Sequence, residues 1–291
     1  MHRSGFVNII GNPNVGKSTL MNCMVGERIS IITSKSQTTR HRILGIVNGD
    51  DFQIVYSDTP GIIRPNYRMQ ERMMSFVSTA ISDADIIIYV TDILDKSEKN
   101  SEFVERVKSA QIPVIVVVNK VDLVSPAETD SVIAEWKSVF PERDVVAVSA
   151  LTGYQVDLLF QKIRDLLPEG PKWFPDDQLT DKTERFIVSE IIREKILLNY
   201  KKEIPYSVEV EIESFKETEK IINISAVINV ARESQKGIVI GHKGEALKKV
   251  GTAARIDTET FFGKPVFLEM FVRVKKDWRN SDRMLDSFGY R

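Results

Sequence analysis

Short apolar runs alternate with amphipathic stretches over the first 167 residues of the chain. The apolar runs predict strands at 7–10, 42–47, 52–57, 86–91, 114–118 and 145–148. The stretches between them place apolar residues at helical spacing and predict helices at 18–25, 68–81, 102–110, 128–140 and 156–167. Strands that alternate with helices favour an α/β fold with a largely parallel sheet covered on both faces. Asn48-Gly49 separates two of the strands and is a hairpin signal, so one strand is expected to be antiparallel.

A different pattern begins after residue 167. Residues 168–177 hold three prolines and one glycine, which cannot continue a helix and predict a linker. A long helix (183–199), two strands of alternating polarity, a short helix, the turn 241–244, a helix to residue 262 and a strand (266–274) follow. We therefore expect a first domain at 1–167, a linker at 168–180, and an α-β-β-α-α-β domain at 181–291.

Composition narrows the class of protein. The 291 residues carry a net charge of −1 and are 42% apolar, as in soluble globular proteins. One cysteine and three histidines exclude a disulfide scaffold and a zinc cluster, and they favour a reducing, cytoplasmic location. Cys23 is expected in the core.

No apolar run is long enough to span a membrane. Residues 232–291 hold 13 basic and 8 acidic side chains, a local excess that suits a polyanion.

A phosphate-binding loop follows the first predicted strand and opens the first helix. Its residues fit G-x-x-x-x-G-K-[ST] and are Gly11, Asn12, Pro13, Asn14, Val15, Gly16, Lys17 and Ser18. Glycines let backbone N–H groups surround a phosphate at the positive end of a helix. Lys17 is expected to reach the β- and γ-phosphates, and the Ser18 hydroxyl to bind Mg²⁺.

Residues after two later strands select the base. Asn119-Lys120-Val121-Asp122 places a carboxylate where guanine presents two N–H donors. Adenine has no such donors, so ATP would leave the Asp122 carboxylate unpaired, and an ATPase is disfavoured. In Ser149-Ala150-Leu151, the N–H of Ala150 is expected to donate to the guanine oxygen.

A third group would sense the γ-phosphate. Asp58-Thr59-Pro60-Gly61 ends a strand, so Asp58 can hold a Mg²⁺-bound water and the Gly61 N–H can face the γ-phosphate. A threonine in the polar segment 37–41 must close over the same ion. Thr39 is favoured and Thr38 remains the alternative. Lys17, Thr39 and Gly61 are the expected catalytic groups.

Gly241-His242-Lys243-Gly244 joins two predicted helices in the second domain. Such a G-x-x-G turn lets backbone approach nucleic-acid phosphates, although alone it is often only a helix–helix turn. Ile238 and Ile240 are expected to form the floor of a groove for unstacked bases. The basic residues expected at the RNA are His242, Lys243, Lys248, Lys249, Lys275, Lys276 and Arg279. Trp278 either stacks on a base or packs in the core.

The nucleotide motifs, with Gln37-Thr38-Thr39-Arg40 and the G-x-x-G unit, make the chain resemble the Era family of bacterial GTPases over nearly its whole length. The resemblance implies a P-loop GTPase domain followed by a type-2 KH domain. It implies GTP/GDP and Mg²⁺ as ligands, the 3′ region of 16S rRNA as partner, and a role in 30S subunit assembly, most simply as a monomer.

The same resemblance marks two features of the chemistry. Ile62 stands where other GTPases carry a glutamine that orients water, so hydrolysis should be slow without a partner. In some relatives an asparagine at the position of Asn14 binds K⁺, so K⁺ is a candidate cofactor. Two alternatives stay open: a slow nucleotide-sensing RNA assembly factor, and a peripheral GTPase of the cell membrane that uses helix 183–199 or the basic tail.

Overall fold

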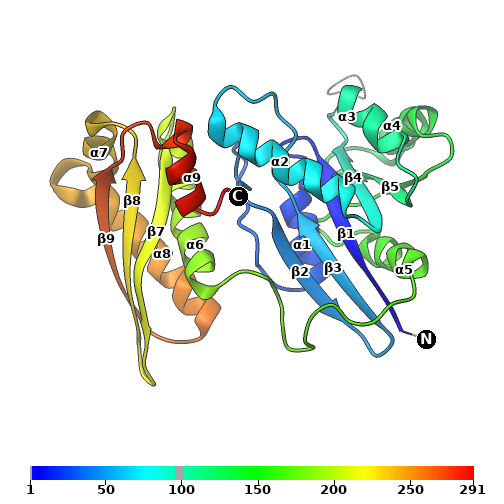
Figure 1. Cartoon of the computed structure of the whole chain (residues 1–291). Coiled ribbons are helices and arrows are strands. Elements are labelled where there is room, and N and C mark those ends of the chain that lie inside the picture. Colours follow the sequence, from blue (N-terminus) through cyan, green and yellow to red (C-terminus); the bar gives the residue numbers. More distant parts are fainter. Residues whose placement is uncertain (1, 96–100) are drawn as a thin grey trace. The chain divides into compact units, whose positions relative to one another are not determined.

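The computed structural model describes residues 2–95 and 101–291, and the described chain forms two compact units (Figure 1). The first unit comprises Met1–Ser30, Thr39–Pro65 and Met73–Asp181. The second comprises Ile31–Thr38, Asn66–Arg72 and Lys182–Arg291. Two short segments from the first part of the sequence therefore belong to the second unit.

A six-stranded sheet forms the centre of the first unit. Its spatial order is β2-β3-β1-β4-β5-β6, and only β2 runs antiparallel to its neighbour. The antiparallel β2–β3 hairpin and the parallel remainder confirm the sequence prediction. The strands are β1 (Arg3–Gly11), β2 (Ile43–Asn48), β3 (Phe52–Asp58), β4 (Ile86–Asp92), β5 (Val114–Asn119) and β6 (Asp144–Ala147).

Helices cover both faces of this sheet (Figure 1). One apolar cluster joins β4 and β5 to three helices, with Val77, Val107 and Trp136 as buried examples from each. On the opposite face, α1 contacts β1, β2, β3 and α5. The helices are α1 (Lys17–Val25), α2 (Arg68–Ser82), α3 (Ser101–Lys108), α4 (Pro126–Val139) and α5 (Val156–Leu166), with the short η1 (Val121–Leu123) before α4.

The segment predicted to be a linker lies along the edge strand β2. The N–H of Ile46 donates to the Leu179 carbonyl at 2.8 Å, and the Thr180 hydroxyl donates to the Leu44 carbonyl at 2.6 Å. Residues 176–181 therefore cover an otherwise open sheet edge, a place where unpaired backbone invites aggregation, whereas residues 168–171 bond to the start of β1.

The second unit has a three-stranded sheet of order β7-β8-β9. Strands β7 and β8 are antiparallel, and β8 and β9 are parallel. Helices α6, α7 and α8 bury apolar residues on one face of the sheet, including Val188, Val239 and Val250. Helix α6 begins where the Thr183 side chain accepts from the Phe186 N–H.

The order of these elements is the α-β-β-α-α-β order expected from the sequence. They are α6 (Glu184–Asn199), η2 (Ile204–Tyr206), β7 (Val208–Glu217), β8 (Ile222–Val230), α7 (Glu233–Ile240), η3 (His242–Gly244), α8 (Glu245–Phe262), β9 (Val266–Val274), η4 (Trp278–Asn280) and α9 (Asp282–Ser287).

The structure contradicts the prediction for Cys23 and decides between the two alternatives for Trp278. Cys23 is exposed rather than in the core, because α1 turns Leu20, Met21 and Met24 inward and leaves Cys23 off that face. Trp278 is fully buried, and its indole N–H donates to the Ser207 carbonyl at 3.2 Å. Of the two alternatives for Trp278, core packing is correct, because a buried indole has no free face for a base.

In the described part of the chain, no helix is both long and apolar enough to cross a bilayer. The apolar face of α6, offered by the sequence as an alternative membrane-binding surface, is buried: Val188, Ile192 and Ile196 are all 0% exposed. This face of α6 is therefore not available to bind a membrane.

Candidate nucleotide and RNA sites

The phosphate-binding loop spans the turn from β1 to α1. Gly16 has φ 93°, and a Cβ there would lie 2.2 Å from the Asn119 side-chain nitrogen, so only glycine fits. Lys17 is buried and donates to the carbonyls of Gly11 and Asn12 at 3.1 and 2.8 Å. Burial lowers the pKa of the Lys17 amine to about 8, although Asp58 and then Asp95 oppose that shift.

Asn12 anchors the underside of the loop. Its amide donates to the Asp95 carboxylate at 2.6 Å, a partner that no sequence pattern had marked. Val15 is buried and Asn14 is exposed. Asn14 has φ 66°, a left-handed conformation uncommon for a residue other than glycine and often found at functional sites.

Ser18, Thr39 and Asp58 meet at one point. The Ser18 hydroxyl donates to Asp58 Oδ2 at 2.6 Å, the Thr39 hydroxyl lies 2.9 Å from the Ser18 hydroxyl, and Thr39 donates to Asp58 Oδ2 at 3.2 Å. Among the described residues, Asp58 Oδ1 has no hydrogen-bond partner although it is buried. Burial raises the pKa of Asp58, while Lys17 and the hydroxyls of Ser18, Ser30 and Thr39 act against that rise.

This cluster suits a hard cation. It combines two hydroxyl oxygens with a carboxylate whose second oxygen lacks a partner, and Mg²⁺ takes oxygen ligands of this kind. Thr38 lies elsewhere: its hydroxyl donates to the Lys35 carbonyl at 2.6 Å and lies 2.6 Å from the Thr33 hydroxyl. Of the two candidate threonines, Thr39 is therefore the one beside Ser18 and Asp58.

The residues after Asp58 are held in place by hydrogen bonds to β1. The buried Thr59 hydroxyl donates to the Ile9 carbonyl at 2.7 Å, and Pro60 is also buried. The N–H of Ile62 donates to the Gly11 carbonyl at 3.1 Å, and its side chain is buried in the apolar cluster beneath. The side chain of Ile62 is thus part of the apolar core, and Gly61 is left partly exposed.

Asn119 and Lys120 tie the base-selecting loops to the phosphate loop. The Asn119 amide donates to the Val15 carbonyl at 2.8 Å. Lys120, with φ 65°, donates to the Asn14 carbonyl at 2.5 Å and to the Asp92 carboxylate at 2.6 Å. The two left-handed residues, Asn14 and Lys120, therefore lie in direct contact.

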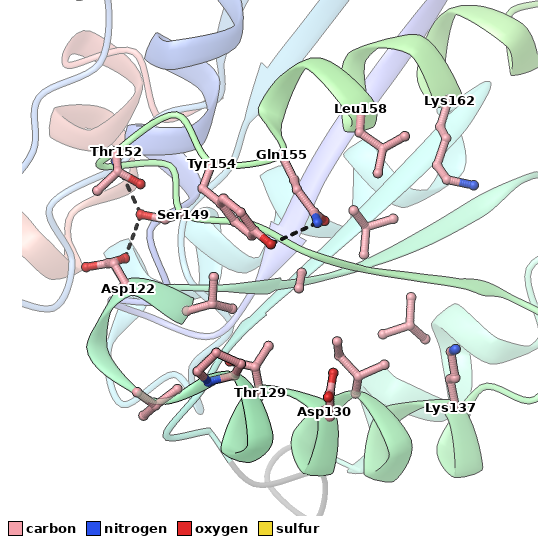
Figure 2. Close-up of a pocket in the computed structure, with 17 residues that line it drawn as sticks. Asp122, Thr129, Asp130, Lys137, Ser149, Thr152, Tyr154, Gln155, Leu158 and Lys162 are labelled. Atoms are coloured by element: carbon pink, nitrogen blue, oxygen red, sulfur yellow. Dashed lines mark hydrogen bonds between the residues drawn. The ribbon is translucent and has the colours of Figure 1, made fainter.

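Asp122 is exposed and is oriented by Ser149, whose hydroxyl donates to Asp122 Oδ1 at 2.6 Å (Figure 2). Both line one end of a groove of about 670 Å³ between η1, α4, β6 and α5. The N–H of Ala150, predicted to donate to the guanine oxygen, donates here to Asn119 Oδ1 at 3.0 Å and satisfies this buried amide oxygen. Its role at the base stays a prediction. Val121 is half-buried and Leu151 is exposed.

The G-x-x-G turn lies between α7 and α8. Gly241 has φ 74°, and a Cβ there would lie 2.6 Å from the Ala246 Cβ, so a larger residue is strained. Gly244 is also left-handed, and His242 and Lys243 are exposed. Lys248 and Lys249 are exposed on the first turns of α8. The structure thus brings backbone and positive charge together at this turn, as expected.

A cavity of about 340 Å³ adjoins the turn. The described residues that line it come from the turn, α8 and β9: Gly244, Leu247, Lys248, Gly251, Thr252, Arg255, Leu268 and Met270. Ile238 is 54% exposed, and neither it nor Ile240 lines this cavity, so their place in the groove floor stays a prediction. The sequence analysis did not single out Arg255 or the β9 residues, and Arg255 donates to the Glu259 carboxylate at 2.7 and 2.8 Å.

The basic residues after β9 are less available than expected. Lys275 donates to the Glu211 carboxylate at 2.7 Å and lies over the Phe288 ring. The Arg279 guanidinium lies 4.8 Å from the centre of the Tyr67 ring. Lys276 is exposed. Of the three, Lys276 is the side chain directed to solvent.

Comparisons with known proteins agree with this architecture. A family described as 50S ribosome-binding GTPase matches residues 6–120, and the KH domain family matches residues 203–279. GTPase Era of Geotalea daltonii is 49% identical over 289 residues, covering 99% of this chain and 97% of that protein. GTPase Era of Geobacter metallireducens is 48% identical over 291 residues, covering 99% and 98%.

Solved structures agree over the full length. A crystal structure of Era in complex with MgGDPNP and nucleotides 1506–1542 of 16S ribosomal RNA matches with a TM-score of 0.95 and 38% identity, covering 100% of this chain and 99% of that one. A variant of Aquifex aeolicus Era bound to GDP and AlF₄⁻ also matches with a TM-score of 0.95, at 37% identity and with 99% of each chain covered.

Fold and site together define a P-loop GTPase that carries a KH domain behind it. The chain is also close to 50% identical to the two Era proteins over nearly its whole length, and this sequence identity shows its family. The chain belongs to the Era GTPases.

Proposed function

We propose that this GTPase is a nucleotide-dependent RNA-binding switch that binds the 3′ region of 16S rRNA and acts in assembly of the 30S subunit. The observation that carries the proposal is the cavity beside the Gly241–Gly244 turn, where apolar Leu268 and Met270 lie next to cationic Lys248 and Arg255. Unstacked bases need an apolar wall and phosphates need positive charge. The full-length relative solved with a 16S rRNA segment supports this RNA as the partner.

The site residues have distinct roles in this proposal. Ser18, Thr39 and Asp58 would hold Mg²⁺, which neutralises charge on the phosphates, and Lys17 would add the ammonium. Asp122 would select guanine. Domains at 1–167 and 181–291, with a linker at 168–180, would carry the nucleotide and the RNA. The RNA-facing residues would be the turn itself with Lys248, Lys249 and Lys276, together with Arg255.

Hydrolysis in this protein has to proceed without a side-chain amide after Gly61, because isoleucine at position 62 carries none and its side chain is buried. Backbone groups such as the Gly61 N–H would then orient the water. We also propose that Asn14, an exposed residue of the phosphate-binding loop, contributes to a K⁺ site. Its test is the GTP turnover rate in K⁺ and in Na⁺ at equal ionic strength, with Asn14→Ala beside the wild type. Equal turnover rates of the wild type in K⁺ and in Na⁺ would overturn the proposed K⁺ site.

A second candidate is a nucleotide-sensing assembly factor that hydrolyses GTP very slowly. The buried side chain of Ile62 favours it. Single-turnover hydrolysis with and without RNA separates the two: a switch is accelerated by RNA, whereas a sensor stays slow.

The test of RNA binding through the turn uses a charge reversal. Lys243→Asp should weaken binding of a labelled RNA carrying the 16S 3′-terminal sequence by about tenfold or more in the GTP-analogue state. Lys220→Asp makes the same change on an exposed turn between β7 and β8 and should have little effect. Equal affinity of Lys243→Asp and wild type would overturn the assignment. Sedimentation of the same samples tests the expected monomer.

A further inference from the structure

The segment Ile31–Thr38 is bound to helix α6 through its backbone. The N–H of Ile32 donates to Glu194 Oε1 at 3.1 Å. Arg193 donates to the Thr38 carbonyl, and the ammonium of Lys35 donates to the carbonyls of Leu197 and Tyr200 at the end of the helix. These bonds fix the backbone of residues 31–38 against α6, and Thr39 follows Thr38 directly.

Arg193 is a rigid support for that contact. Its side chain is 1% exposed and is paired with Glu190, 5% exposed, by two bonds of 2.7 and 2.5 Å. A buried guanidinium must keep its donors paired, so it has little freedom to leave the Thr38 carbonyl. The segment before Thr39 is therefore seated on a fixed surface of the second unit.

Tyr200 touches this segment and helix α7 at once. Its carbonyl accepts from Lys35, and its hydroxyl donates to the Val239 carbonyl at 2.6 Å. Val239 is 0% exposed and lies in the last turn of α7, where carbonyls lack partners within the helix. The Tyr200 hydroxyl thus fixes the end of α7 two residues before Gly241.

A second connection reaches the helix on the other side of the turn. Glu194 also accepts from Lys195 at 3.0 Å, and Lys195 donates to Asp257 on α8. The helices before and after the G-x-x-G turn are both joined to the part of α6 that holds residues 31–38.

We propose that the bonds from Lys35 through Tyr200 to Val239 transmit the nucleotide state to the RNA-binding turn, with Tyr200 as the positioning residue. This inference rests on the proposed function, in which GTP orders Thr39 and the turn binds RNA. Ordering of Thr39 fixes the position of Thr38 and Lys35, and the Tyr200 hydroxyl carries that constraint to the end of α7. Coupling of two sites requires an element that both sites bias, and residues 31–38 on α6 supply it.

The test compares RNA affinity in two nucleotide states. In the full-length protein, the dissociation constant for the 16S 3′-terminal RNA is measured with GTP analogue and with GDP, and the ratio of the two is the coupling. Tyr200→Phe removes only the hydroxyl. It should reduce a wild-type ratio of about 5 to 150 to within a factor of two or three of one. The affinity of the RNA-free protein for GTP analogue should stay unchanged.

Tyr290→Phe is the matched control. It also removes a hydroxyl bond in the second unit, here a 2.8 Å bond to Glu209, but away from α7. It should keep the wild-type ratio. Lys35→Met, a change at a half-buried residue, should lower the ratio as Tyr200→Phe does, and the double variant should be no worse than either single one.

The outcomes distinguish a failure of the proposed function from a failure of the link through Tyr200 alone. A wild-type protein without RNA affinity, or with a ratio of one, overturns the proposed function and this inference with it. A wild-type ratio that persists in both Tyr200→Phe and Lys35→Met overturns the link alone. Reciprocity gives an independent readout: RNA should raise the affinity for GTP analogue by the same factor, and that gain should also vanish in Tyr200→Phe.

Discussion

The Ser18 hydroxyl lies 2.6 Å from Asp58 Oδ2, and the other oxygen of the same carboxylate is buried without a hydrogen-bond partner among the described residues. An unpaired buried acceptor is costly, so this oxygen is suited to take a further ligand. Thr39 completes the set from a different part of the chain. In the proposed function, the response to nucleotide depends on this cluster of three side chains.

Thr39→Ala and Thr38→Ala should separate the two neighbouring threonines. Loss of the Thr39 hydroxyl from the cluster should weaken GTP-analogue binding about tenfold in Mg²⁺ and leave GDP binding nearly unchanged. The Thr38 hydroxyl, the group that the change removes, bonds to Thr33 and Lys35 of its own segment, so Thr38→Ala should keep the affinity for both nucleotides. Titration with a fluorescent nucleotide measures both. The reverse ranking would remove Thr39 from its role.

Asp122→Asn should move the base preference from guanosine toward xanthosine nucleotides. The amide cannot accept from the two guanine donors, so GTP affinity should fall by about 100-fold. Asp130→Asn is the control, because Asp130 lines the same groove (Figure 2) without taking part in the predicted base contact. Competition with GTP, XTP and ATP gives the order. An unchanged preference in Asp122→Asn would contradict the base assignment.

Trp278→Phe should destabilise the protein without removing RNA binding. The indole is fully buried and its N–H bonds to the Ser207 carbonyl, so the change should lower the free energy of unfolding by about 1–3 kcal/mol. Urea denaturation measures this. Trp173→Phe, at a side chain 59% exposed, should have a smaller effect. A loss of RNA affinity with unchanged stability would restore the stacking role for Trp278.

Cys23 should react slowly at neutral pH although it is exposed. Partial burial of the thiol, and then Asp157, raise its pKa above the ordinary value, so less thiolate is present at any given pH below that pKa. The rate of iodoacetamide labelling should fall below that of a free thiol at pH 8 and rise as the pH approaches the raised pKa. Cys23→Ser should abolish labelling, because the chain has one cysteine. Labelling faster than a free thiol would contradict the direction of the shift.

The sequence predicts those parts of the fold that local pattern dictates. The strands and helices follow from alternation and helical spacing, and Lys17, Ser18, Asp58 and Asp122 stand in motifs that place them at strand ends. Trp278 was ambiguous because the chain after β9 folds back onto Ser207, a contact between residues distant in sequence. Cys23 was misplaced because α1 is mostly apolar and shows no clear inner face.

The seat of residues 31–38 on α6 could not be predicted from the sequence for a further physical reason. Arg193 and Lys35 bond to main-chain carbonyls, and a carbonyl has no residue identity that a pattern could reveal. The same holds for the hydroxyl of Tyr200 on Val239. Only the three-dimensional arrangement shows that these side chains meet backbone from elsewhere in the chain.

The most direct test of the account is equilibrium binding of the 16S 3′-terminal RNA to the wild-type protein with GTP analogue and with GDP, at fixed salt. The account predicts binding at least about fivefold tighter with the analogue. Affinity that is the same in both nucleotide states, or no affinity for this RNA, would contradict it.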